Sequence, residues 1–152
     1  MSNEKQLDVR FVSVEAGITA LGFRRIAAIA RKLNPQTKIY FIPVDNLYSL
    51  LTHIFPFRKS KFNSKDVESI SAELQDANLI CFSSMSASSG YIKKIIISLK
   101  KRKSKAFILW GGVHCTLYPD DAIKHADAIC LGEGEISFEQ FFQAFKSGKD
   151  YS

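Results

Sequence analysis

Apolar residues recur along the chain in two different periods, and together these predict five strands separated by helices. Short β-branched or aromatic runs indicate strands at residues 9–14, 38–44, 79–83, 106–110 and 126–131. Apolar residues at helical spacing indicate helices at residues 19–33, 64–76, 91–103, 120–125 and 137–146. Residues 47–54 predict one or two helical turns that end at Pro56. We expect Ser64 to cap the helix that it begins, because its hydroxyl can accept from the first turn.

Strands alternate with helices throughout, and the inner strands are apolar on both faces. This pattern favours a parallel sheet that is covered by helices on both sides. We therefore predict an α/β fold, a flavodoxin-like doubly wound five-stranded parallel sheet of order 2-1-3-4-5, in three Rossmann-like layers. The chain has 152 residues, of which 46% are hydrophobic, and no repeat or linker divides it. We expect a single domain over residues 1–152.

The net charge of +6 raises the question of a nucleic-acid partner. Most of the excess lies in Lys93-Lys94 and in residues 100–105, at the end of a predicted helix. Cations are favoured at a helix C-terminus, where the macrodipole is negative. No aromatic residues interleave with these lysines, although stacking on bases needs them. We therefore expect no nucleic-acid partner.

The lengths of the apolar runs and the spacing of the cysteines indicate the cellular compartment of the protein. No apolar run approaches the roughly 20 residues that span a bilayer, and the first eight residues lack the apolar segment of a secretory signal. Cys81, Cys115 and Cys130 are too scattered for a disulfide framework, and no Cys/His spacing indicates a metal site. The sequence predicts a cytoplasmic protein with no membrane insertion and no metal ligands.

Candidate chemistry lies in the loops that follow the strands, since ligands of open α/β sheets bind at the carboxyl ends of the strands. These loops are rich in Gly and Ser and poor in charged side chains. The candidate ligand-binding residues are Gly17 and Thr19, then Ser83, Ser84 and Met85, then Gly111, Gly112, Val113 and His114, and finally Gly132, Glu133 and Gly134.

Each candidate has a structural alternative. Gly111 and Gly112 lack Cβ atoms, so a ligand can lie on their backbone, or they form a tight turn. The serine hydroxyls can bind a ligand or cap the next helix, and Glu133 can bond an amide or ribose hydroxyl or favour the start of the last helix. A loop-fixing hydrogen bond is the main role expected for His114. No catalytic residue is predicted, because no base is evident for Cys115.

Three known ligand sites of doubly wound folds can be compared with these loops. A phosphoacceptor site needs an acidic pair after the first strand, where only Glu15 stands. A dinucleotide site needs GxGxxG, which residues 17–22 do not supply. A flavodoxin needs a hydroxyl-rich phosphate loop there, and Thr19 alone meets this need. An FMN or nucleotide binder stays as an alternative, as does a non-catalytic interaction domain with a degenerate ligand site.

Three motifs in order carry a resemblance to a known family. They are Ser83-Ser84-Met85, then Gly111-Gly112-Val113-His114 with Tyr118-Pro119-Asp120, and then Gly132-Glu133-Gly134-Glu135. With them the chain resembles the cobalamin (vitamin B12)-binding domain at the N-terminus of B12-dependent radical SAM enzymes, which include the anaerobic magnesium-protoporphyrin IX monomethyl ester oxidative cyclase. The resemblance covers nearly the whole chain and is strongest over residues 79–145.

The resemblance implies a corrin ring across the strand ends and a nucleotide tail inserted into the sheet crevice. Ser83 and Met85 would border the tail, Gly111 and Gly112 would let it pass, and residues 132–135 would lie near the tail or the corrin rim. The family's better-known DxHxxG signature supplies a histidine to cobalt, but residues 15–19 contain none. The resemblance therefore implies a histidine-off state, with water, no ligand or a non-histidine group at the lower axial position.

The radical SAM half of such enzymes is not found, since no CxxxCxxC motif occurs. We expect the chain to be an N-terminal fragment that binds cobalamin without catalysing a reaction alone. S-adenosylmethionine and a 4Fe-4S cluster would belong only to the missing domain of the parent, which would carry out methyl transfer or oxidative cyclisation.

Overall fold

Five parallel strands form a single sheet in the computed structural model of the chain, which describes residues 7–15, 20–42 and 62–148. The strand order is β2-β1-β3-β4-β5. The strands are β1 (Val9–Ser13), β2 (Lys38–Phe41), β3 (Leu79–Ser83), β4 (Phe107–Gly111) and β5 (Ala128–Ile129). Gly17, Thr19 and the turns expected at 47–54 lie outside the described residues.

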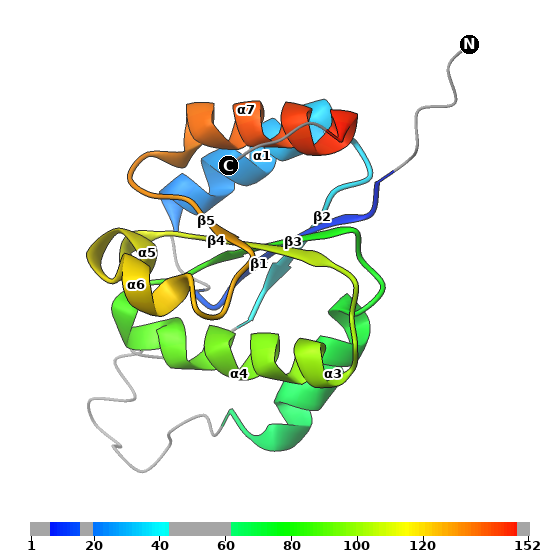
Figure 1. Cartoon of the computed structure of the whole chain (residues 1–152), viewed down its shortest axis with the longest axis vertical. Coiled ribbons are helices and arrows are strands. Elements are labelled where there is room, and N and C mark those ends of the chain that lie inside the picture. The colour runs from blue at the N-terminus through cyan, green and yellow to red at the C-terminus, as the bar shows by residue number, and fades with distance from the viewer. Residues whose placement is uncertain (1–6, 16–19, 43–61, 149–152) are drawn as a thin grey trace.

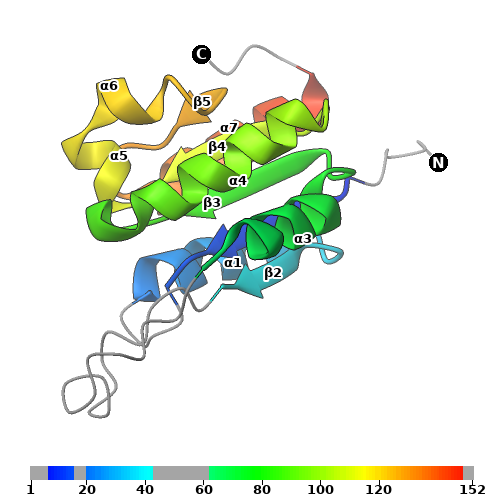
Figure 2. The ribbon, with the colours of Figure 1, turned by 90° about the horizontal axis from the view of Figure 1, so that it is seen from below.

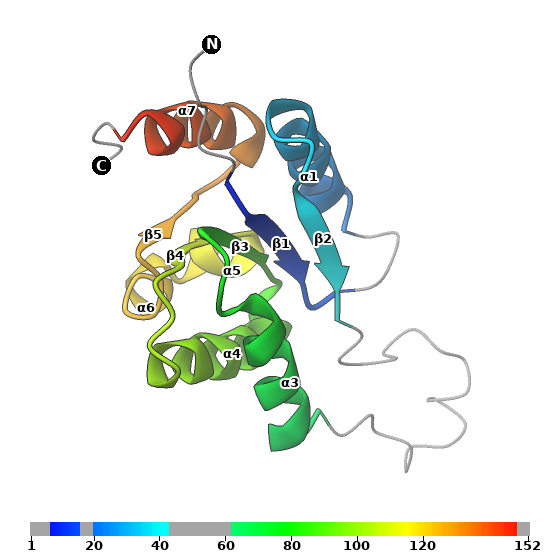
Figure 3. The same cartoon turned by 90° about the vertical axis from the view of Figure 1, so that its right-hand side faces the viewer.

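Helices cover both faces of the sheet. They are α1 (Leu21–Leu33), α3 (Ser64–Leu74), α4 (Ser89–Lys101), α5 (Val113–Leu117), α6 (Pro119–Ala122) and α7 (Gly134–Ser147), with a 3-10 turn η1 (Ser86–Ser88) before α4. One face carries α1 and α7, and the other carries α3 and α4 (Figures 1 and 2). Figure 3 shows the parallel strands between these two layers. The predicted flavodoxin-like three-layer fold and its strand order are confirmed.

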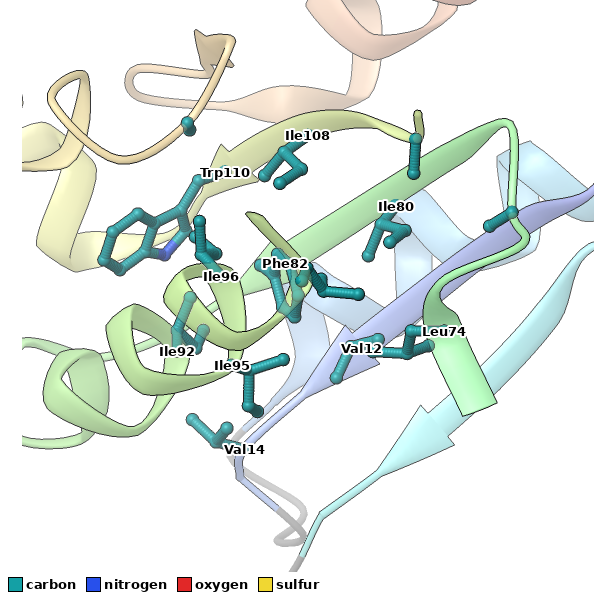
Figure 4. Packing of buried hydrophobic residues seen from close by; sticks show 14 of the residues in the cluster. Val12, Val14, Leu74, Ile80, Phe82, Ile92, Ile95, Ile96, Ile108 and Trp110 are labelled. Atoms are coloured by element: carbon teal, nitrogen blue, oxygen red, sulfur yellow. The ribbon is translucent and has the colours of Figure 1, made fainter. Parts of the chain in front are cut away.

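Alternation along the strands sends side chains into two separate cores. Ile108 and Trp110 of β4 face α3 and α4, where Ile92, Ile95 and Ile96 of α4 are fully buried (Figure 4). Leu109 faces the opposite way and belongs to the core under α1 and α7. This alternation also means that Gly111 has the same facing as Leu109.

The described helices end close to where the sequence predicts, but the expected cap of α3 is wrong. The N-cap is Asn63, whose Oδ1 accepts from Lys65 N at 2.8 Å and from Asp66 N at 3.2 Å. The Asp66 carboxylate accepts in return from Asn63 N, completing a capping box. Ser64 and Asn63 are both good capping residues, so residue type alone does not decide which of these two neighbours is the N-cap.

Larger differences occur after β4. Residues Val113–Leu117 form a short helix where we expected a loop, and α7 begins at Gly134 rather than at residue 137. The last strand pairs over two residues only, not over 126–131. A side chain explains its late start, because Asp127 Oδ2 accepts from Ile108 N at 2.8 Å, where a strand carbonyl would otherwise pair. No helix in the described ranges combines the length and apolar character needed to cross a bilayer.

Asp8 pairs with Arg10 and, at 3.9 Å, with Lys38 at the amino end of the sheet. Arg10 is only 7% exposed, although it lies on the central strand β1. Its Nε donates to Asp8 Oδ1 at 3.0 Å and its Nη2 donates to Asp8 Oδ2. These hydrogen bonds from Arg10 hold the pKa of the Asp8 carboxyl below its usual range. The carboxylate therefore compensates a buried cation.

Asp8→Asn is expected to lower the free energy of unfolding at pH 7 by about 1–3 kcal/mol, because it leaves the Arg10 guanidinium without its charge partner. Since the folded pKa is lowered, the stabilisation is present above the unfolded pKa and is lost as pH falls through the folded value. Urea unfolding of both proteins at neutral and acidic pH measures this. The exposed Asp76→Asn serves as the control, and equal stability of Asp8→Asn and wild type at pH 7 would refute the expectation.

Candidate ligand-binding site

A cavity of about 490 Å³ opens at the carboxyl ends of β1, β3 and β4, on the side that α1 and α7 cover. Its floor is apolar and includes Phe11, Cys81, Leu109 and Phe138. Ligand pockets of proteins are commonly about 300–1,000 Å³ and largely apolar. In parallel α/β sheets, ligands bind outside the carboxyl ends of the strands, near the point where the strand order reverses. The cavity meets both conditions.

A larger cavity, of about 1140 Å³, lies at the opposite edge of the sheet. It is lined by the turns that precede β3 and β4 and by the end of α7, and its polar side chains include Arg102, Lys103 and Gln143. No carboxyl end of a strand reaches it. The carboxyl-edge cavity is therefore the candidate site, although it is the smaller of the two.

Most of the predicted site residues meet at this cavity. Its lining includes Ser83, Ser84, Met85, Gly111, Gly112, Val113, Gly132, Glu133 and Gly134. The apolar floor and the α1 wall, with Ala20, Phe23 and Ile26, were missed. The strand residues of the floor could have been predicted from the alternation of the strands, because every second residue of β1, β3 and β4 faces the α1 and α7 layer.

The two neighbouring glycines differ in what surrounds them. A Cβ atom on Gly112 would lie 2.7 Å from Ser84 O and 2.9 Å from Ser84 N, and its φ is +98°. Glycine at position 112 is therefore required by the packing of the β3 and β4 loops against each other. A Cβ atom on Gly111 would lie 3.5 Å from Cys130 Cβ, an ordinary contact. It is Gly111 whose missing side chain leaves room in the cavity.

His114 is not among the residues that line the cavity. It is 4% exposed, and its ring stacks on Trp110 with the ring centroids 5.2 Å apart. His114 Nε2 lies 3.0 Å from Asp121 Oδ2, a carboxyl that also pairs with Lys93 and has a lowered pKa, chiefly because Lys93 donates to it. The imidazole thus joins α5 to α6. Within the described residues, no histidine lines the cavity.

Carboxylates predominate at the cavity, although the whole chain is cationic. Glu15, Glu133 and Glu135 line it together with one cation, Arg25. Arg25 Nη1 lies 3.2 Å from Glu135 Oε1, which leaves the other two carboxylates without an ion pair among the described residues. A site of this kind favours a ligand whose groups donate hydrogen bonds over one that presents a phosphate dianion.

Three of the apolar side chains that line the cavity are exposed. Met85, Val113 and Leu117 are 46%, 42% and 61% exposed. Exposed apolar surface commonly marks a binding site. We call these three residues the apolar rim.

The three cysteines are predicted to differ in reactivity. Burial raises the pKa of Cys115 to about 12 and that of Cys81 well above its usual value. Cys130 is partly exposed, and its pKa is raised mainly by burial and secondarily by Glu135. Because the thiolate is the nucleophile, iodoacetamide at pH 8 should alkylate Cys130 first, yet more slowly than a free thiol, as mass spectrometry can follow. Equal labelling of Cys115 in the folded protein would contradict this expectation.

The fold and the cavity define a parallel α/β ligand-binding domain with its site at the carboxyl edge of the sheet. The model of the B12 binding domain family matches residues 8–142, so the chain belongs to that family. The resemblance found in the sequence is thereby confirmed at the level of a cobalamin-binding domain. Within the described residues, no three His, Cys, Asp or Glu side chains gather to hold a metal ion.

A solved structure is also similar to the chain. It is the N-terminal domain of a hypothetical protein of Thermotoga maritima, with 20% identity and a TM-score of 0.43. The match covers 66% of this chain and 80% of the other. The curated proteins give no match.

Proposed function

We propose that this chain binds cobalamin in the carboxyl-edge cavity, in a histidine-off state, as the cobalamin-binding module of a B12-dependent radical SAM enzyme. One combined observation carries the proposal. A chain of the B12 binding domain family has a cavity of about 490 Å³ with an apolar floor at the carboxyl edge of its sheet. S-adenosylmethionine and a 4Fe-4S cluster would be held by a radical SAM domain of the parent protein.

The residues at the cavity fit the parts of cobalamin. The apolar floor suits the flat benzimidazole of the nucleotide tail, and Gly111 adds no side chain to the cavity beside Cys130. The apolar rim suits the edge of a broad ring system, which buries apolar surface on contact. Glu133 can accept N–H bonds from the peripheral amides of the corrin.

Cobalamin, when bound, supplies the redox and methyl-transfer chemistry of its cobalt. The residues of this chain would bind it, orient it and exclude water from its tail. In the described part of the chain, the cavity presents no activated thiol, since the pKa values of Cys81 and Cys130, the thiols that line it, are raised. We therefore assign binding to this domain and place substrate chemistry in the parent, as methyl transfer or oxidative cyclisation.

An FMN or nucleotide binder is the second candidate, and the charge at the cavity disfavours it. A phosphate monoester carries about −1.5 to −2 charges at pH 7 and needs N–H donors or cations. Among the described residues, Arg25 is the one cation that lines the cavity, and Glu135 already pairs with it. A domain with a degenerate site would bind neither cofactor.

Titration with hydroxocobalamin tests the proposal. The protein should retain a corrin absorption spectrum through gel filtration, whereas a yellow flavin retained in its place would favour the FMN reading. The histidine-off state has its own test on protein labelled with ¹⁵N and loaded with Co(II) cobalamin. Electron paramagnetic resonance should then show no coupling to a protein nitrogen, and a ¹⁵N doublet would refute this state.

A further inference from the structure

The Glu15 carboxylate joins the loops that follow β1 and β3. Its Oε1 accepts from Met85 N at 2.7 Å and from Ser88 Oγ at 3.2 Å. The backbone of Glu15 is itself held, because its N donates to Ser13 Oγ at 3.1 Å. Since β1 and β3 are adjacent strands, this side chain bridges the point where the strand order reverses.

The bridge determines where one side of the cavity lies. Ser83, Ser84 and Met85 form that side, and the carboxylate binds the main chain at its last residue. From the opposite side, Gly112 packs against the backbone of Ser84, and His114 N donates to Ser84 O at 3.3 Å. The segment 83–85 is therefore held between the loops that follow β1 and β4.

The contact needs an acceptor at this position more than it needs a charge. Glu15 forms no ion pair with a described residue, and both of its partners are neutral donors. A glutamine has the same length and can accept both hydrogen bonds with its amide oxygen. An alanine leaves Met85 N without this acceptor, whereas Ser88 Oγ can still donate to Met85 O at 3.2 Å.

We propose that Glu15 is a positioning residue of the cobalamin site, which holds residues 83–85 in the conformation that receives the ligand. The inference rests on the proposed function of the cavity. Without the bridge, binding must also order residues 83–85, and the free-energy cost of this ordering reduces the free energy of binding. Loss of hydrogen bonds to a charged acceptor is expected to raise the Kd of cobalamin about 10- to 100-fold.

The test compares three variants by titration with hydroxocobalamin, followed by visible absorption. Glu15→Ala should show the weakened affinity, and Glu15→Gln should stay within about threefold of wild type. Asn63→Ala is the matched control, because it also removes a side chain that accepts two hydrogen bonds at a helix start. Asn63 caps α3, a helix on the other face of the sheet, so its replacement should lower stability without changing the Kd.

Hydrogen exchange at the Met85 amide adds a direct measurement. Exchange should be faster in Glu15→Ala than in wild type and Glu15→Gln. Wild-type binding with an unchanged Kd in Glu15→Ala would overturn this inference and leave the proposed function standing. So would an equal loss of affinity in Asn63→Ala, because the loss would then follow stability alone. Failure of wild type to bind hydroxocobalamin would overturn both the proposed function and this inference.

Discussion

Gly112→Ala is expected to lower the free energy of unfolding by about 3–5 kcal/mol, because two costs coincide at this position. The backbone has φ +98° and ψ −177°, a region that is essentially restricted to glycine. The new methyl group would also lie 2.7 Å from Ser84 O, a backbone atom that cannot rotate away. Urea unfolding followed by circular dichroism measures the loss.

Gly90→Ala is the matched control for this experiment. Gly90 lies in α4, and a Cβ atom there would meet nothing within 4 Å. The change should be neutral or stabilise the protein by up to about 1 kcal/mol, since alanine favours helix. Unchanged stability in Gly112→Ala would show that the loops after β3 and β4 do not pack as described.

Gly111→Val is expected to weaken cobalamin binding at least about 100-fold while the domain stays folded. Gly111 faces the same side of the sheet as Leu109, which lines the floor, so its new side chain enters the cavity beside Cys130. Valine suits a strand, and the first added carbon meets Cys130 Cβ at an ordinary 3.5 Å. Hydroxocobalamin titration and urea unfolding separate the two effects.

Gly111→Ala provides a graded comparison for this substitution. Its single methyl group fits without a clash and should reduce affinity only a few-fold. A valine variant that binds as wild type does would place the ligand elsewhere, since the space beside Cys130 would then be unused. A valine variant that fails to fold would contradict the ordinary contact with Cys130 that the structure gives to a side chain at this position.

The fold was predictable because the apolar periods of its strands and helices agree with the residues that begin and end these elements. The apolar runs at 79–83 and 106–110 coincide with β3 and β4 to within a residue, and buried parallel strands explain their uninterrupted apolar character. The segment after Gly112 was not predictable in this way. Its helix has five residues and no side-chain cap, so neither period nor capping residue marks it.

The site was predictable as a set of loops but not as a set of contacts. Strand order places the loops after β3, β4 and β5 at one edge, which is why nine of the candidate residues line a single cavity. The bridge from Glu15 to Met85 depends on side-chain geometry between residues 70 positions apart, and the facing of His114 depends on the short helix α5. Sequence spacing carries no information on such contacts.

The buried indole of Trp110 makes the domain its own fluorescence reporter. This is the single tryptophan of the chain, fully shielded from solvent, and its Nε1 donates to Ser84 Oγ at 3.1 Å. Ser84 is in turn part of the cavity lining, so one hydrogen bond links the fluorophore to a residue of the cavity. A corrin absorbs where indole emits, and its arrival would therefore quench the emission by energy transfer without any attached dye.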